Sequence, residues 1–338
     1  MKESVFSLTP SPAASLERPL HLPWGVEDLE LLHHYMSSVA LSGKDTPFWR
    51  DQLPRFAFCH YSVLHLILAI SALHLARREA NRADELVERA EAHLTVGLHQ
   101  VNQTLPNLNE ENCTELYIST ILICVCTLAK KPGPRHLLVV SDGQEVAWWE
   151  LFRGVRIMVE TFGISNVVAK LTNDTASQPT AKPDEEADQD EVNHILPKVI
   201  QWEGALNDLF SLITAAPDGM REVYQSTVGT LVWCFQETYG SSAETKPVAD
   251  IKFQTIFVWL YRLEDAFVDS LKEREPIALV ILAHFAVLLQ TLEVVWFLRG
   301  WASHIVEAVS EILASSPCSQ WIQWPVRQVQ SGSVCSNN

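Results

Sequence analysis

One stretch of the sequence constrains the fold more than any other, an almost unbroken apolar run from Ile277 to Leu289. The run is too short to span a bilayer, which needs about 20 apolar residues. A helix that is apolar on every side must be covered by other elements. We therefore predict a buried core helix in a soluble protein, and we expect its helical pattern to continue through Trp296, Phe297 and Trp301.

Helix-period spacing of apolar residues also covers most of the preceding chain. We predict helices in the ranges 26–43, 60–78, 81–105, 113–129, 144–162, 195–215, 219–239 and 250–272. The second and third of these ranges follow each other closely and are expected to form an antiparallel hairpin. Runs that alternate apolar and polar residues are absent from the sequence, and residues 136–140 are expected to form a lone strand or a buried loop. The predicted fold is all-α, an irregular helical bundle of about 9–12 helices around a buried apolar C-terminal helix.

Changes in composition divide the chain into five parts. Residues 173–192 contain two prolines and seven acidic residues with almost no large apolar side chain. Such a segment cannot bury enough surface to offset the entropy lost on ordering. The predicted parts are a disordered lead (1–22), an N-terminal helical half (23–170), an acidic disordered insertion (171–194), a C-terminal helical half (195–328) and a disordered tail (329–338).

Charge and cysteine content exclude several classes of protein. The formal net charge is -16, and no cluster of basic residues exceeds the pairs Arg77-Arg78 and Lys130-Lys131. Because duplex binding needs several basic side chains on phosphates, we predict no direct nucleic acid binding by this chain. The seven cysteines include no C-x-x-C pair, which argues against a zinc site. The N-terminus lacks the apolar core of a secretory signal, so we expect a nuclear or cytoplasmic protein without a membrane span.

Motifs of catalysis, cofactor binding and metal binding are not found in the sequence. It contains no P-loop, no G-x-S-x-G and no G-x-G-x-x-G. The acidic string at 184–188, with Asn207, Asp208 and Ser211, imitates the magnesium motifs of terpene cyclases, but the next ligand position is Ala215. We therefore predict no cofactor and no metal. The sequence favours a role other than catalysis, and an enzyme with an unconventional site stays open as the alternative.

Five blocks of sequence, in order, resemble the regulatory domain of fungal zinc-cluster transcription factors, and within them the branch of sterol uptake control regulators. The blocks are DLELLHHY (28–35), LILAISALHLA (66–76), WWELFRGVR (148–156), EPIALVILAHFAVLL (275–289) and the tryptophan-rich stretch 296–325. The resemblance implies an all-helical domain that dimerises, with itself or with related regulators, holds a small hydrophobic ligand and controls transcription. In the sterol branch that ligand is a sterol. Family members usually carry an N-terminal cluster of six cysteines, whereas the first cysteine here is Cys59.

Aromatic residues near the C-terminal core helix are the candidates for a ligand site. Aromatic walls with one or two polar groups suit a rigid apolar ligand. The predicted ligand-binding residues are His284, Phe285, Leu288, Trp296, Phe297 and Trp301. The competing interpretation is that these rings only fill the core, because an aromatic stripe on a helix is more often core than pocket.

The sequence thus predicts a transcription-regulator domain that senses a sterol-like metabolite without a DNA-binding module of its own. The alternative is a biosynthetic-cluster accessory protein, or an unconventional enzyme, recruited from the same scaffold.

Overall fold

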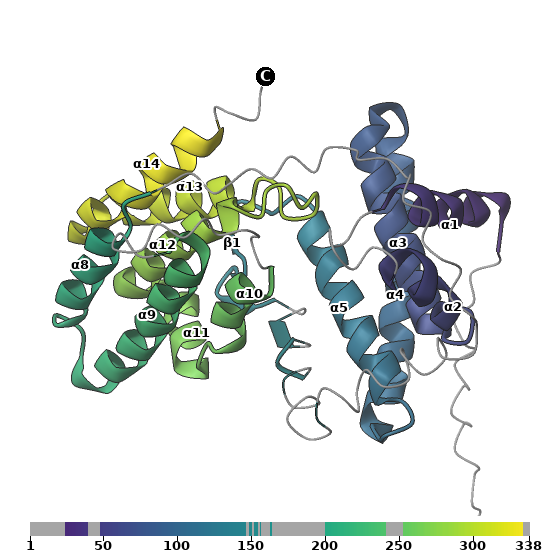
Figure 1. Cartoon of the computed structure of the whole chain (residues 1–338), viewed down its shortest axis with the longest axis horizontal. Helices are drawn as coiled ribbons and strands as arrows, with labels where there is room; N and C mark the ends of the chain where they lie inside the picture. The colour runs from purple at the N-terminus through teal and green to yellow at the C-terminus, as the bar shows by residue number, and fades with distance from the viewer. Residues whose placement is uncertain are drawn as a thin grey trace, which may run out of the picture.

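The computed structural model describes residues 24–39, 48–146, 149–150, 152–154, 156, 163, 200–240 and 253–333. The chain is predominantly α-helical, with helices α1 to α5 at one end and α8 to α14 at the other (Figure 1). The all-α prediction is confirmed. The predicted lead and the acidic insertion lie outside the described residues.

The N-terminal group is built around two long helices. Its members are α1 (Val26–Ser38), α2 (Leu53–Ala57), α3 (Tyr61–Arg78), α4 (Ala83–Thr104) and α5 (Cys113–Ala129). Helices α3 and α4 form the expected antiparallel hairpin, and their backbones approach each other closely at Gly97. A Cβ atom at this glycine would lie only 2.8 Å from Cγ of Leu66, so the absence of a side chain sets the helix spacing.

Helix α1 buries an unexpected face. Asp28, Leu31 and Tyr35 are buried, whereas Leu29 is 66% exposed and Met36 is 41% exposed. Of the apolar residues at helical spacing in this range, Leu29 and Met36 therefore lie on the outer side of α1, and Leu32 is half-buried against the core. Helix α1 is held by polar contacts, including a 2.5 Å hydrogen bond from the Ser71 hydroxyl to the carbonyl of Leu31.

A small sheet follows α5, where the sequence predicted a lone strand or a loop. Strands β1 (His136–Leu137), β2 (Val140–Ser141) and β3 (Gln144–Glu145) pair antiparallel in the order β1-β2-β3. Asp142 and Gly143 connect β2 to β3 with φ of 51° and 76°. An Asp-Gly pair with both φ angles positive is a preferred two-residue hairpin turn. The helix predicted from residue 144 is therefore wrong at its start, and the first described helical residues after β3 are 149–150.

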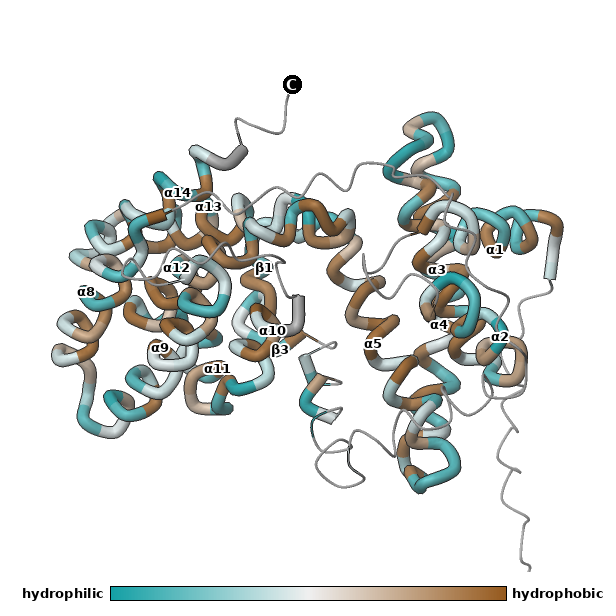
Figure 2. Tube along the Cα trace, viewed as in Figure 1, coloured by the Kyte–Doolittle hydropathy of each residue, from teal (hydrophilic) through white to brown (hydrophobic). Residues whose placement is uncertain are grey.

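The C-terminal group surrounds the apolar helix. It contains α8 (Glu203–Ile213), α9 (Asp218–Tyr239), α10 (Phe253–Tyr261), α11 (Asp265–Lys272), α12 (Pro276–Gln290), α13 (Trp301–Leu313), a 3-10 helix (Pro317–Ile322) and α14 (Gln323–Ser333). Every residue of α12 from position 278 to 289 is buried, and Figure 2 shows its apolar path enclosed by neighbouring helices. The prediction of a buried apolar C-terminal helix is confirmed. Helix α14 extends into the predicted tail, where Val329 is buried.

Helix α12 ends at Gln290, so the helix predicted to continue through Trp296 is wrong. Residues 291–300, the connecting segment, form successive turns, and Gly300, with φ of 89°, directly precedes α13. Backbone N–H groups of residues 292, 295, 298 and 301 each donate to the carbonyl three positions earlier. A three-residue repeat of turns spaces apolar side chains almost as a helix does, which explains the error. Within the described ranges, no helix is both long and apolar enough to cross a membrane.

Candidate functional site

The six predicted ligand residues come from α12, the connecting segment and the start of α13. Five of them, all except Trp296, are at most 2% exposed, and Trp296 is half-buried. Side chains packed this closely leave a ligand little room unless the connecting segment moves. The predicted residues also divide into two clusters with different neighbours.

The first cluster lies on α12 and faces the C-terminal helices. Phe285 stacks on Trp259 with ring centroids 4.2 Å apart, and His284 stacks on Trp324 at 5.5 Å. The Nδ1–H of His284 donates to the carbonyl of Val280 at 2.8 Å. Burial lowers the pKa of His284 to about 4, so this ring is neutral near pH 7 and its Nε2 is an acceptor. The first cluster therefore carries one neutral polar atom in an aromatic setting.

The second cluster lies where the two groups of helices meet. Trp296 packs edge-on against Phe297 and against His74 of α3, with centroids 5.6 and 4.9 Å apart. The guanidinium of Arg77 lies 5.5 Å from the Trp296 ring and donates to the carbonyl of Trp296. The same guanidinium donates to the carbonyl of Ala129 at 2.8 Å, at the end of α5. Helix α3 thus holds the connecting segment against α5.

Trp301 anchors α13 at the same junction. Its Nε1–H donates to the carbonyl of Leu128 at 2.8 Å, one residue before the α5 carbonyl that Arg77 holds. The ring of His136 lies 5.0 Å from Trp301, and His304 donates from Nε2 to the His136 carbonyl at 2.8 Å. Burial and the proximity of His304 lower the pKa of His136 to about 4. Both tryptophans of the predicted site therefore also join the two halves.

Two polar atoms at this junction lack hydrogen bonds. The Nε1–H of Trp296 and the Nδ1 of His136 are buried, and neither has a hydrogen-bond partner among the described residues. An unsatisfied buried donor costs about 1–3 kcal/mol, which makes such atoms places where a ligand could gain hydrogen bonds. Of these two residues, only Trp296 was predicted. His136 could not be found from sequence, because its neighbour Trp301 is 165 positions away.

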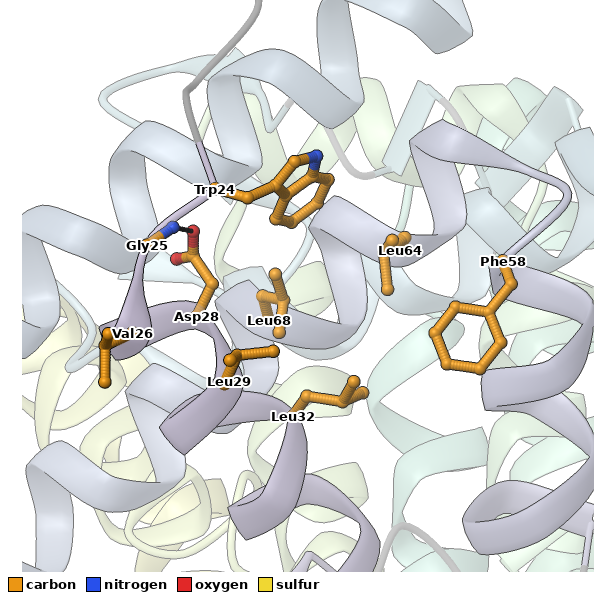
Figure 3. Close-up of a pocket in the computed structure, with 9 residues that line it drawn as sticks. All are labelled: Trp24, Gly25, Val26, Asp28, Leu29, Leu32, Phe58, Leu64 and Leu68. Atoms are coloured by element: carbon orange, nitrogen blue, oxygen red, sulfur yellow. Dashed lines mark hydrogen bonds between the residues drawn. The ribbon is translucent and has the colours of Figure 1, made fainter.

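A surface groove lies elsewhere, against α1. It has a volume of about 500 Å³ and is lined by Trp24, Gly25, Val26, Asp28, Leu29, Leu32, Phe58, Leu64 and Leu68 (Figure 3). None of the predicted ligand residues lines this α1 groove. Apart from Gly25 and Asp28, its lining is apolar.

Asp28 is the one charged residue of the α1 groove and is only 2% exposed. Its carboxylate accepts hydrogen bonds from Arg89 and from His93, whose Nε2 lies at 3.1 Å. His93 in turn lies 2.8 Å from Nδ1 of His65, whose ring stacks under Trp24. Burial alone would raise the pKa of Asp28, but the Arg89 hydrogen bond and the other partners hold it below its ordinary value. The negative charge of Asp28 at the floor of the groove is thus paired with the positive charge of Arg89.

The described residues contain no group of three or more His, Cys, Asp or Glu side chains placed to hold a metal ion.

Comparison with known proteins bears on the role of this arrangement. Residues 30–190 match the family described as "Fungal specific transcription factor domain". A Zn(2)-C6 fungal-type transcription factor of Gibberella zeae is 23% identical over 329 residues, covering 89% of this chain and 61% of that protein.

Two further relatives are named for sterol uptake. Sterol uptake control protein 2 of Candida albicans is 34% identical over 112 residues, which are 32% of this chain and 15% of that protein. The Saccharomyces cerevisiae protein of the same name is 29% identical over 111 residues, or 31% and 12%. The chain therefore spans less than two thirds of each relative. The chain thus contains a segment that matches a fungal transcription factor domain, and parts of it are similar to sterol uptake control proteins.

Proposed function

We propose that this domain binds a small hydrophobic, sterol-like metabolite and thereby modulates transcription. The family match concerns transcription, and two relatives are named for control of sterol uptake. With a net charge of -16, the chain is not expected to bind DNA directly, so its effect would reach DNA through a partner or another module. Its place of action would be the nucleus, with the cytoplasm as a second location.

The ligand would lie at the six predicted residues, and the unsatisfied Nε1–H of Trp296 is the observation that carries this proposal. A sterol has an apolar ring system with one hydroxyl group. Such a hydroxyl could accept the Trp296 N–H, while the aromatic side chains cover the rings.

Binding would act by shifting the connecting segment. Because the predicted residues are packed against one another and their neighbours, a ligand enters only if residues 291–300 move. That movement would alter the contacts of Trp296 with His74 and Arg77 on α3. A ligand that binds the shifted arrangement more tightly would increase its population, which is all that a ligand-operated switch requires.

Equilibrium binding of radiolabelled ergosterol to the purified full chain tests the ligand. We expect saturable binding, and we expect Trp296→Phe to weaken it about 5-fold, because the substitution removes one hydrogen bond and keeps a ring. Trp233→Phe is the matched control, since Trp233 is 41% exposed on α9. Absence of sterol binding by the wild-type chain would refute this part.

A reporter assay tests the regulatory role separately. The full chain is fused to an unrelated DNA-binding module, and reporter output is measured with and without sterol depletion. We expect output to change with sterol level, and the Trp296→Phe fusion to respond less. A fusion that binds sterol but leaves the reporter unchanged would show a binding protein that does not regulate transcription.

A further inference from the structure

Exposed apolar surface gathers at the α1 groove. Among the described residues, ten large apolar side chains are exposed, and four of them line this groove: Trp24 (47%), Val26 (79%), Leu29 (66%) and Phe58 (61%). The other six, apart from Met36 on α1, are scattered over different elements. Exposed apolar side chains that gather in this way on a folded domain mark places where another molecule binds.

Buried polar contacts fix the orientation of α1 beside the groove. The Asp28 carboxylate accepts hydrogen bonds from Arg89. The Ser71 hydroxyl donates to the carbonyl of Leu31. A rotation of α1 that buried Leu29 would break these bonds. The groove is therefore preformed, and a partner would lose little free energy in ordering it.

The shape of the α1 groove favours an elongated protein element over a small molecule. Figure 3 shows Trp24 and Val26 at one end and Phe58 at the other, with Leu29 and Leu32 between them. Small-molecule sites usually enclose most of the ligand surface. Val26 and Phe58 are more than half exposed, so a small ligand here would stay largely in water. A helix laid across the groove could instead place into it apolar side chains that recur every three or four positions.

The end of the groove at Trp24 is acidic. Helix α1 contains Glu27, Asp28 and Glu30 and has no lysine or arginine. The carboxylate of Glu27 lies over this end of the groove, since a Cβ atom built on the lining residue Gly25 would come 2.5 Å from its Oε2. A negative charge therefore stands at the rim, directly beside the apolar lining.

Arginines compensate this acidic cluster only in part. Five carboxylates lie within 4.0 Å of two guanidinium groups: Arg82 contacts Glu30, Glu79 and Glu85, and Arg89 contacts Glu27 and Asp28. His93 adds no positive charge near pH 7, because burial lowers its pKa. With five negative and two positive groups, the cluster keeps an excess of three negative charges. A partner with basic side chains at this end is therefore favoured.

Trp24 is a second feature that suits a basic side chain. One face of its ring stacks on His65 with ring centroids 5.0 Å apart, and 47% of the residue remains exposed. A lysine or arginine side chain is attracted to the face of an indole ring and pairs with carboxylates. Trp24 and Glu27 together would thus receive a cation at the end of an apolar groove.

We propose that the α1 groove binds an amphipathic helix of a partner protein, whose apolar row fills the groove and whose lysine or arginine lies at Trp24 and Glu27. A nucleic acid fits this end poorly, because the excess negative charge repels phosphates. A second copy of α1 fits it poorly too, because its own Glu27 and Glu30 would add negative charge. The groove shares no residue with the six predicted ligand residues, so this proposal does not depend on the proposed ligand.

Fluorescence anisotropy of a labelled synthetic helix, titrated with the full chain, tests this site. The probe has leucines at positions i, i+3, i+4 and i+7, with lysines and arginines on its polar side. Its twin has glutamates in place of the basic residues. We expect saturable binding of the basic helix, and binding of the acidic twin that is weaker by about 10-fold or more.

Matched variants locate the binding on the chain. Leu29→Ser should weaken binding of the basic helix about 10-fold, because it removes an apolar contact of the groove. Val294→Ser is its control, since Val294 is 64% exposed on the connecting segment. Glu27→Gln should weaken binding about 3-fold, whereas Glu307→Gln, which changes the net charge equally at an exposed position of α13, should leave it unchanged. Circular dichroism verifies that each variant is folded.

Three results would overturn the proposal. If the wild-type chain does not bind the basic helix, a second copy or another segment of this chain is left as the occupant. If Leu29→Ser and Val294→Ser have equal effects, the helix binds another face. If the acidic twin binds as well as the basic helix, or Glu27→Gln and Glu307→Gln weaken binding equally, no basic side chain is recognised at Trp24.

Discussion

Replacement of Asp28 by Asn gives the sharpest test of how α1 is held. The Asp28 carboxylate accepts from the backbone N–H of Gly25 at 2.9 Å, from Arg89 Nε at 3.1 Å and Nη2 at 2.5 Å, and from His93 Nε2 at 3.1 Å. Asparagine has nearly the same shape, but it loses the charge and turns an NH2 group toward a donor. Breaking a buried ion pair costs about 3–5 kcal/mol. The Arg89 side chain is 32% exposed and can be partly solvated, so we expect a loss of about 2–3 kcal/mol.

Urea unfolding followed by circular dichroism measures this loss. Glu27→Gln is the matched control, because Glu27 is 56% exposed and lies 4.0 Å from the same guanidinium, and we expect it to change stability by about 0.5 kcal/mol or less. The pKa of Asp28 is held below its ordinary value of 3.8. Its stabilisation is therefore present above about pH 4 and disappears as pH falls through the folded pKa. Equal stabilities of Asp28→Asn and Glu27→Gln at neutral pH would refute the anchoring role.

Three further perturbations test the helix packing at Gly97, the contacts of Arg77 between the two groups of helices, and the protonation of the buried His284. In the same urea assay, Gly97→Ala should destabilise the protein by about 1–3 kcal/mol, because the added Cβ would overlap Leu66. Gly229→Ala is the control: a Cβ at this position would have no neighbouring atom within 4 Å, so the change should be neutral or stabilise by up to about 1 kcal/mol. Arg77→Met should lower the free energy of unfolding by about 2 kcal/mol, because it removes two hydrogen bonds to backbone carbonyls, whereas Arg78→Met should lower it by about 0.5 kcal/mol or less. Similar losses in the two variants would contradict the role of Arg77 in joining the two groups of helices. Burial lowers the pKa of His284 from 6.5 to about 4. As the pH falls, the unfolded chain therefore binds a proton at this residue before the folded chain does. Protonation of His284 should lower the free energy of unfolding of the wild-type protein by about 2 kcal/mol between about pH 7 and 5. His284→Gln should show a smaller loss between the two pH values, and an unchanged loss would count against a buried neutral ring.

The helices were largely predictable because burial leaves a period in the sequence. Helices α3, α4, α5 and α9 fall within one or two residues of the predicted ranges. The errors arise where another structure copies that period or where distant residues decide. Turns with a three-residue repeat imitated a helix in the connecting segment. The buried side of α1 was missed because the partners of Asp28 are 61 and 65 positions away on α4.

The candidate site was less predictable than the fold, for a related reason. Sequence indicates that a tryptophan is buried, but not which surface covers it. Trp296 is covered by α3, more than 200 positions earlier, and Trp301 donates to a carbonyl 173 positions away. Residues predicted as one pocket therefore serve two clusters. The unsatisfied N–H of Trp296 depends on that distant packing, and no local pattern could have revealed it.

The contacts where the two groups of helices meet also set how much more tightly a ligand must bind the released arrangement than the packed one if it is to move the connecting segment. The connecting segment and the start of α13 are held by two hydrogen bonds, from Arg77 to the carbonyl of Trp296 and from Trp301 to the carbonyl of Leu128. Releasing the segment from both would forfeit one neutral and one charge-assisted hydrogen bond, about 3 kcal/mol together. A ligand can shift an equilibrium only by its difference in affinity for the two states. A sterol that operates this junction must therefore bind the released arrangement about 100-fold more tightly than the packed one.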